Sequence, residues 1–317
     1  MVGPATFSRA HGDAGGIAGG VPDDGPVTEP YLARLARRSD AAGTVLCVGI
    51  DPTPDMLPEG WPTGLAGIER LARLIVEAAA PHAAAVKPNL AFFEAYGSAG
   101  LAALERVLAA TPPGVLVVAD AKRADVETTA ARQAVALFDA LGADAVTVNP
   151  YLGMDALAAF VDRADRFAYV LCRTSNPGAG ELQDLVVAAD PSLGAPAEAL
   201  HRRVARRVAA AGLGERAGLV VGATAPTELA GIRELVPGLA FLVPGVGTQG
   251  GDAAPVLAAG PATAGLAGSG AGGGLLVNVS RGIAASARGG PDAASGDPGE
   301  RLAEAARRWA ATLPVLS

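Results

Sequence analysis

The chain has 317 residues, half of them hydrophobic, so its length and composition allow one large folded domain with a sizeable core. Its formal net charge of −7 argues against a nucleic-acid partner, because such proteins need a basic surface that displaces counterions from the phosphates. A small anionic substrate is still compatible with this charge, since a few amides and one arginine are enough to bind a phosphate group.

The first segment of the chain, residues 1–28, is rich in Gly, Ala and Pro and has no hydrophobic periodicity, so we expect a flexible arm. It lacks a basic patch followed by an apolar stretch, and no run of about 18 apolar residues follows, so neither a signal peptide nor a membrane span is expected. Cys47 and Cys172 lie in apolar runs, as small core residues of a reducing compartment do. These features predict a cytoplasmic protein.

Residues 29–317 alternate short apolar runs with helical patterns, which we interpret as one catalytic domain. The runs are unbroken hydrophobics, as is typical of strands covered on both faces. The predicted strands are 44–51, 83–87, 115–122, 145–150, 168–175, 219–224, 241–247 and 275–280. Eight strands with intervening helices predict the α/β class and a (β/α)₈ TIM barrel. Periodicity alone leaves an open doubly wound sheet as the alternative.

Two segments near the end of the chain, 261–274 and 288–299, are dominated by Gly, Ala, Ser and Pro. Such a composition cannot build a second hydrophobic core, and it is typical of flexible linkers. We therefore expect two flexible Gly/Ala-rich insertions on the barrel, near its last strand and its last helix.

Groups able to act on a substrate fall at the ends of most predicted strands. In a parallel barrel, the carboxyl ends of the strands and the loops that follow them form the active face. The residues at or just after strand ends are Asp51, Lys87, Asp120, Lys122, Ser175, Gln249 and Arg281. The sequence therefore predicts one polar site at this face of the barrel.

The densest cluster of charges is the segment DAKRAD, residues 120–125. Asp120 and Lys122 are two residues apart, so on a strand they point to the same side. A single Lys–Asp pair is more often structural than functional, but Lys87 and Asp125 add two further charges at neighbouring strand ends. Four alternating charges are a costly way to stabilise a fold, so we interpret them as a catalytic group.

A second cluster, residues 245–252, matches the dinucleotide fingerprint G-x-G-x-x-G. It follows the seventh predicted strand instead of the first, and no acidic residue follows about twenty positions later, so NAD binding is disfavoured. Glycines let a backbone approach an anion closely, which favours a phosphate loop at Gly247, Gly250 and Gly251. Arg281 adds a forked donor for the same phosphate. A glycine turn beside a surface arginine is the alternative.

Other catalytic chemistries find little support in the sequence. His11, His82 and His201 lie away from the strand ends, and no His/Cys/carboxylate spacing suits a zinc ion, so no metal is expected. Ser175 is not in a nucleophile elbow and has no histidine beside it, which favours a hydrogen-bonding role.

Six motifs, in this order and spacing, resemble orotidine 5'-phosphate decarboxylases, in particular the longer bacterial group (type 2). The motifs are VGIDP at 48–52, VKPN at 86–89, DAKRAD at 120–125, TSNPG at 174–178, PGVGTQGGD at 244–252 and NVSRGI at 278–283. The resemblance implies a carboxy-lyase that converts orotidine 5'-phosphate into uridine 5'-phosphate in de novo pyrimidine biosynthesis, by direct decarboxylation and without a cofactor.

The resemblance also implies roles for single residues. Lys122 is implied as the proton donor, with Asp120 beside the substrate carboxylate, and Asp51 and Lys87 as ligands of the ribose hydroxyls. Ser175 is implied to contact the pyrimidine, and Gln249 and Arg281 the phosphate. Asp125 and Thr129 are implied to reach the active site of a second subunit, which predicts a homodimer with shared sites. Ser280 stands where relatives often have Gly, which leaves the backbone contribution to phosphate binding open.

Two other functions are compatible with the same pattern. Barrel enzymes that act on sugar phosphates with magnesium carry a similar DxKxxD motif, and here Asp51 or Glu94 is the candidate metal ligand. A catalytically silent sensor of a phosphate ligand is the other alternative, which the intact set of lysines and aspartates disfavours.

Overall fold

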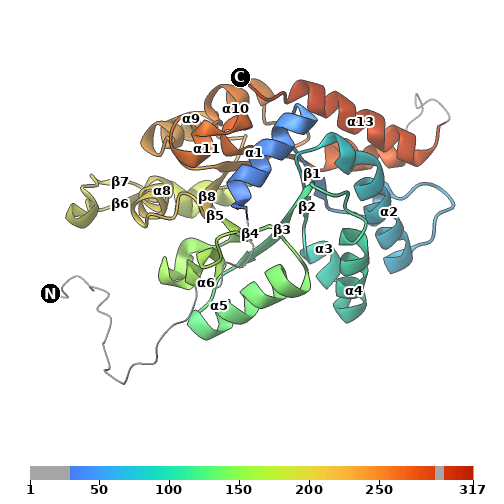
Figure 1. Ribbon diagram of the computed structural model, residues 1–317, viewed down its shortest axis with the longest axis horizontal. Coiled ribbons are helices and arrows are strands. Elements are labelled where there is room, and N and C mark those ends of the chain that lie inside the picture. Colours follow the sequence, from blue (N-terminus) through green and yellow to red (C-terminus); the bar gives the residue numbers. More distant parts are fainter. Residues whose placement is uncertain (1–28, 290–295, 317) are drawn as a thin grey trace, which may run out of the picture.

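The computed structural model describes residues 29–289 and 296–316 and contains a closed parallel barrel (Figure 1). Its strand order is β1-β10-β9-β8-β5-β4-β3-β2, and β1 pairs with both β10 and β2. The predicted (β/α)₈ barrel is therefore confirmed. The closed ring excludes the open doubly wound sheet, which would leave two strands unpaired at its edges.

The barrel strands are β1 (Leu46–Ile50), β2 (Ala85–Pro88), β3 (Leu116–Arg123), β4 (Ala145–Val148), β5 (Phe167–Arg173), β8 (Ala217–Val221), β9 (Phe241–Pro244) and β10 (Leu275–Val279). A short antiparallel hairpin, β6 (Val186–Val187) with β7 (Glu198–Ala199), lies outside the barrel beside α8 (Figure 1).

The α-helices are α1 (Tyr31–Ala42), α2 (Gly64–Ala79), α3 (Ala91–Glu94), α4 (Gly97–Leu108), α5 (Glu127–Ala134), α6 (Ala158–Val161), α7 (Gly180–Gln183), α8 (Leu200–Ala210), α9 (Pro226–Leu235), α10 (Ala253–Ala259), α11 (Gly265–Ser269), α12 (Arg281–Ala284) and α13 (Pro298–Thr312). None of the described helices combines the length and the apolarity that crossing a membrane requires.

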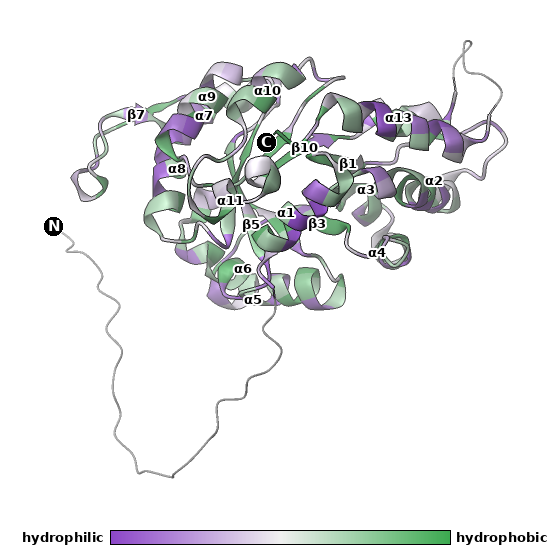
Figure 2. Cartoon of the chain, turned by 45° about the horizontal axis from the view of Figure 1, so that its top comes forward, coloured by the Kyte–Doolittle hydropathy of each residue, from purple (hydrophilic) through white to green (hydrophobic). Residues whose placement is uncertain are grey.

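Hydrophobic burial explains why these segments form a barrel. Every residue of β1, β8 and β10 is buried, as expected for strands with the barrel interior on one side and helices on the other. In α2 the buried side chains include Ile68, Leu71 and Ile75, which recur at steps of three and four residues and face the barrel. Figure 2 shows the consequence, with hydrophobic strands inside and hydrophilic residues concentrated on the surrounding helices and loops.

The first described helix, α1, closes the amino-terminal end of the barrel. Tyr31 is fully buried, its ring stacks on Phe167 with 4.8 Å between the centroids, and its hydroxyl lies 3.2 Å from the hydroxyl of Tyr169. At the same end Arg34 donates to Asp144, the residue before β4, at 2.5 Å. This plug leaves the carboxyl ends of the strands as the open face.

The segment 261–274 differs from the flexible insertion that its composition predicts. It forms α11 and a 3₁₀ turn at Ala271–Gly274, and Gly272, Gly273 and Gly274 are buried. A Cβ on Gly270 would lie 2.7 Å from the Cβ of Ala36 in α1, so the lack of side chains allows close packing against that helix. The prediction was wrong because small residues serve tight packing as well as flexibility.

The other two segments singled out by composition are mostly outside the described residues. Residues 1–28, the predicted arm, and 290–295, the centre of the second predicted insertion, are not described. Within the described part of that insertion, Asp297 caps α13 by accepting the amide of Gly299 at 2.9 Å.

We predict that Tyr31→Ala lowers the free energy of unfolding by about 3–5 kcal/mol, because it removes a fully buried ring from the barrel plug. Denaturant unfolding followed by circular dichroism measures the change. Tyr31→Phe is the matched control: it keeps the stacking on Phe167 and removes only the hydroxyl contact, so a loss of about 1–3 kcal/mol is expected. Equal losses for the two variants would contradict this account of the plug.

Candidate active site

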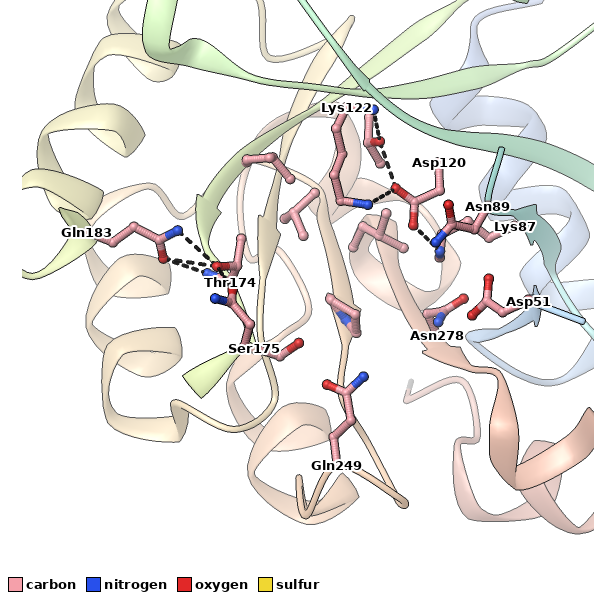
Figure 3. A pocket seen from close by; sticks show the side chains of 16 residues that line it. Asp51, Lys87, Asn89, Asp120, Lys122, Thr174, Ser175, Gln183, Gln249 and Asn278 are labelled. Carbon is pink, nitrogen blue, oxygen red and sulfur yellow. Dashed lines mark hydrogen bonds and ion pairs between the residues drawn. The ribbon is translucent and has the colours of Figure 1, made fainter. Parts of the chain in front are cut away.

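A cavity of about 460 Å³ lies at the carboxyl ends of the barrel strands. It is lined by Asp51, Lys87, Asn89, Asp120, Lys122, Thr147, Leu171, Thr174, Ser175, Asn176, Gln183, Val220, Leu242, Pro244, Gln249 and Asn278. Six residues predicted from the strand ends therefore meet in one cavity: Asp51, Lys87, Asp120, Lys122, Ser175 and Gln249. Figure 3 shows the charged residues together on one side of the cavity, with Thr174 and Ser175 across from them.

Asp120 is the centre of the charged side of the cavity. Its Oδ2 accepts a hydrogen bond from Nζ of Lys87, and its Oδ1 accepts one from Nζ of Lys122 at 2.5 Å (Figure 3). The Lys87 and Asp120 side chains are only 5% and 11% exposed, whereas that of Lys122 is 50% exposed. One carboxylate therefore joins a buried ammonium group to a second ammonium group that a substrate can reach.

Lys87 and Asp120 each stabilise the charged form of the other. Burial alone lowers the pKa of Lys87, but the nearby carboxylates of Asp120 and Asp51 outweigh it and leave the pKa raised. Burial also acts to raise the pKa of Asp120, but Lys87 and Lys122 outweigh it and hold this pKa well below its usual range. Asp120 is therefore a carboxylate, and Lys87 an ammonium group, throughout the neutral pH range.

Lys122 reaches the cavity through an irregular piece of strand. Its φ of +49° is the only positive value at a described residue other than glycine, and the pairing of β3 with β4 shifts register between Ala119 and Arg123. A non-glycine residue in this left-handed region costs on the order of 1–3 kcal/mol and persists only where its surroundings hold it. Asp120 and Lys122 thus share a side as predicted, but through a bulge and not by regular alternation.

Thr147, in the middle of β4, holds this bulge. Its Oγ1 accepts hydrogen bonds from the backbone amides of Ala121 and Lys122, each at 3.0 Å, and donates to Oδ1 of Asp120 at 3.0 Å. Thr147 is 2% exposed. The sequence prediction missed this residue, although a single polar side chain inside the apolar run AVTV was a signal that could have indicated it.

Two residues that line the cavity carry a buried oxygen without a protein partner. Within the described part of the chain, neither Oδ1 of Asp51 nor Oδ1 of Asn278 has a hydrogen-bond partner. Buried polar atoms are almost always paired in folded proteins, so these two oxygens are exceptions at the wall of the cavity. Asn278 was not predicted, although it is the single polar residue of β10.

The side of the cavity that carries Ser175 is braced by Gln183 from α7. The Gln183 side chain accepts the amide of Thr174 at 2.8 Å and donates to the hydroxyl of Thr174 at 2.9 Å. The same hydroxyl donates to Oδ1 of Asn176 at 2.6 Å. This network fixes the loop after β5 and so orients Ser175. No sequence motif indicated Gln183, because its position depends on the folding of a separate short helix.

The glycine loop after β9 differs from the phosphate loop predicted for it. The amide of Gly247 donates to the carbonyl of Gly251, that of Gly250 to Gly247, and that of Gly251 to Gly245. These three amides are used inside the loop, so the prediction that they bind a phosphate does not fit the structure. Positive φ at Gly247 and Gly250 makes the tight turn, and this turn places the side chain of Gln249 at the cavity.

Besides the three loop glycines, three predicted site residues lie outside the cavity. Arg281 begins α12, two positions after the end of β10, and is exposed to solvent. Asp125 lies in the loop after β3, where its Oδ1 accepts the amide of Val126 at 2.7 Å, and Thr129 is exposed on α5. Within a single chain, therefore, Asp125 and Thr129 do not join Lys122, and their predicted role in a second subunit stays a prediction.

The candidate metal ligands are also separated. Asp51 lines the cavity, whereas Glu94 forms an ion pair with Arg123 beside a different pocket. Across residues 29–289 and 296–316, no group of three His, Cys, Asp or Glu side chains is placed to hold a metal ion.

We predict that Asp120→Asn lowers the free energy of unfolding by about 3–5 kcal/mol at neutral pH, because it leaves the ammonium group of Lys87 buried without its main partner. Denaturant unfolding measures the effect. Adding Lys87→Met should restore part of the loss, since a methionine of similar length carries no charge to compensate. If the double variant is no more stable than Asp120→Asn, the loss in Asp120→Asn does not come from an unpaired charge on Lys87.

The same comparison predicts a pH dependence. The pKa of Asp120 is lowered by folding, so its contribution to stability is present above the unfolded carboxyl pKa of about 4 and is lost as pH falls toward the folded value. The difference in unfolding free energy between the wild-type chain and Asp120→Asn should therefore be constant from about pH 5 to 8 and should shrink below about pH 4. A difference that grows with acid would contradict the assignment.

The chain is similar to known proteins over most of its length. A family model described as "Orotidine 5'-phosphate decarboxylase / HUMPS family" matches residues 44–295. The chain is 43% identical over 281 residues to the orotidine 5'-phosphate decarboxylase of Herpetosiphon aurantiacus, covering 88% of this chain and 95% of that protein.

Solved structures give the same result. The chain resembles the OMP decarboxylase of Leishmania donovani with a TM-score of 0.72 and 35% identity, covering 89% of this chain and 97% of the other. It resembles the UMP synthase of the same organism with a TM-score of 0.73 and 37% identity, of which it spans 56%. The chain belongs to the orotidine 5'-phosphate decarboxylase / HUMPS family, as its six motifs predict.

Proposed function

We propose that Lys122 is the proton donor in the decarboxylation of orotidine 5'-phosphate to uridine 5'-phosphate that this chain catalyses in pyrimidine biosynthesis. The observation that carries the proposal is the bridge of Asp120 between buried Lys87 and accessible Lys122. It places a fixed positive charge and an available proton together at the cavity.

The electronic demand of the reaction explains why such a charge is needed. When the bond between C6 and the carboxylate carbon breaks, the electron pair stays on C6 in the plane of the pyrimidine ring, where the π system cannot delocalise it. Stabilising this pair requires a cation that is already in position, because reorienting solvent during the reaction would raise the barrier. The Lys122 ammonium, held 2.5 Å from Oδ1 of Asp120, meets this requirement.

Proton transfer then completes the reaction. Carbon dioxide leaves without the electron pair, the pair on C6 takes a proton from Nζ of Lys122, and the neutral amine regains a proton from water after product release. Asp120 lies beside the substrate carboxylate in this arrangement. Because the departing carbon dioxide is neutral, the repulsion between the two carboxylates decreases as the bond breaks. The chemistry needs neither a metal ion nor an organic cofactor, since Lys122 supplies both the charge and the proton.

The rest of the cavity binds the nucleotide in the proposed complex. Lys87 and Asp51 bind the ribose hydroxyls, since both residues line the cavity. Ser175 contacts the pyrimidine from the opposite side, and Gln249, which lines the cavity, binds the phosphate. Arg281, which is exposed after β10, is the second phosphate ligand in this proposal. Because the glycine amides are used within their loop, we assign the phosphate to these two side chains instead.

A homodimer with shared active sites is part of the proposal. Asp125 and Thr129 lie outside the cavity of their own chain, where they are available to a second one. Apolar side chains are also exposed in the segments that follow the paired strands β3 and β4: Val126 after β3 is 64% exposed, and Tyr151 and Leu152 after β4 are 84% and 50% exposed. Large exposed apolar side chains gathered on one face are typical of a protein–protein contact.

A cytoplasmic location is also proposed. Both cysteines of the chain, Cys47 and Cys172, are free and buried in the core, which is compatible with a reducing compartment. The decarboxylation proposed here needs no component of another compartment.

We predict that Lys122→Ala lowers kcat by at least about 10²–10⁴-fold, because it removes the acid, while binding of uridine 5'-phosphate is largely retained. Loss of the ultraviolet absorbance of orotidine 5'-phosphate measures turnover, and calorimetric titration measures product binding. Chelator-treated wild-type protein is the control: full activity is expected, whereas the magnesium-dependent relatives would lose theirs. Substantial turnover by Lys122→Ala would refute the assignment of the acid.

A second prediction tests the shared site. Lys122→Ala and Asp125→Ala are each expected to be inactive alone, but mixing them should restore activity, because one of the two sites in a mixed dimer contains both wild-type side chains. In an equal mixture with random exchange, half of the dimers are mixed and one of the two sites in each is intact. The total activity should therefore approach one quarter of that of the same amount of wild-type protein. Subunit exchange is verified with two affinity tags. If tagged mixed dimers form and no activity returns, Asp125 does not act across the interface.

A further inference from the structure

Thr147 occupies an unusual place in the site. It is the only polar side chain of β4, it is 2% exposed, and it lines the cavity between the strand that carries it and Asp120 of β3. No motif that carries the family resemblance includes this residue. Its contacts nevertheless join the carboxylate and the backbone on which the proposed acid depends.

The hydrogen bonds of its hydroxyl group are complete. A threonine hydroxyl has one proton to donate and two lone pairs to accept with. The amides of Ala121 and Lys122 occupy both lone pairs, each at 3.0 Å, so the single proton is directed to Oδ1 of Asp120 at 3.0 Å. The direction of this last bond therefore follows from the other two, and it favours the ionised form of Asp120.

The same oxygen of Asp120 also receives Nζ of Lys122 at 2.5 Å. Thr147 therefore acts on Lys122 at two points. It accepts the backbone amide of Lys122 directly, and it is linked to the ammonium group through Asp120. The left-handed φ of +49° at Lys122 is unfavourable by itself, and the bond from its amide to Thr147 is the described contact that retains it.

We infer that Thr147 is a positioning residue for the decarboxylation: its hydroxyl holds Lys122 and Asp120 in the geometry of proton transfer to the substrate carbon. The inference rests on the proposed role of Lys122. Without the hydroxyl, the amides of Ala121 and Lys122 lose their acceptor, and the bulge relaxes toward a regular strand. Lys122 then withdraws from the reacting carbon, while the groups that bind ribose and phosphate stay in place.

The test compares Thr147→Val, which has nearly the same shape without the hydroxyl, with Thr147→Ser, which keeps the hydroxyl. Displacing a catalytic group by about 1 Å costs on the order of 10²-fold in rate, so Thr147→Val should lower kcat by about 10²-fold with little change in KM. Thr147→Ser should stay close to the wild type. If Thr147→Val does not fold, Thr147→Ala removes the same hydroxyl without placing a methyl group against the two amides.

A second readout isolates proton transfer. By microscopic reversibility, the group that protonates C6 also removes the C6 proton of uridine 5'-phosphate, so incorporation of deuterium at C6 in D₂O reports on Lys122 without decarboxylation. This exchange should fall in parallel with kcat in Thr147→Val and persist in Thr147→Ser. Binding of uridine 5'-phosphate, measured by calorimetry, should be retained in both variants.

Two results would overturn the inference. A folded Thr147→Val variant with wild-type kcat and exchange would show that the hydroxyl positions nothing that matters. Equal losses in Thr147→Val and Thr147→Ser, accompanied by loss of product binding, would show that Thr147 only fills space. Failure of the premise is recognised separately: if Lys122→Ala retains turnover and exchange, the acid is misassigned whatever Thr147 does.

Discussion

The structure of the site depends on burying the ammonium group of Lys87 within the barrel. A buried charge is tolerated only when an opposite charge lies against it, and here Asp120 and Asp51 provide that charge from the strands on either side of β2. Because Asp120 has two carboxylate oxygens, it uses Oδ2 for Lys87 and keeps Oδ1 for Lys122. The adjacency of β1, β2 and β3 is thus required for this arrangement, since parallel neighbouring strands bring their carboxyl ends to one face.

The sequence predicted the parts of this arrangement that follow from strand order. Unbroken apolar runs indicated eight strands, and parallel strands present their carboxyl ends at one face, so the order of residues alone was enough to place Lys87, Asp120 and Ser175 together. The bulge at Lys122 could not be predicted, because its φ depends on two hydrogen bonds to Thr147 in the neighbouring strand. Regular strand alternation predicted the correct side for Lys122, but in the structure this side results from the bulge.

Glycine-rich segments were the least predictable part of the chain, because glycine serves several physical purposes with the same composition. In the loop after β9, positive φ at Gly247 and Gly250 closes a turn whose amides bond internally, where an anion site was predicted. In 261–274, buried glycines allow the chain to pack against α1, where flexibility was predicted. A tight turn, an anion site and a close packing contact differ in the hydrogen-bond partners of the amides and in the space around each Cα. The local sequence specifies neither of these.

The charged residues that line the cavity and the residues proposed to bind the phosphate are different groups. The titratable side chains that line it are Asp51, Lys87, Asp120 and Lys122, two acids and two bases, so the cavity offers a nucleotide phosphate little net attraction. A phosphate carries about −1.5 to −2 charges at neutral pH, so in the proposed complex its affinity comes from outside this group, from Gln249 and from Arg281, which is exposed after β10. In that proposed complex, the binding energy of the phosphate holds the substrate carboxylate against Asp120, a contact that is unfavourable until carbon dioxide departs. In the proposed complex, a site whose charges balance therefore accepts an anionic substrate: the two carboxylates order the two lysines, and the affinity comes from the phosphate ligands.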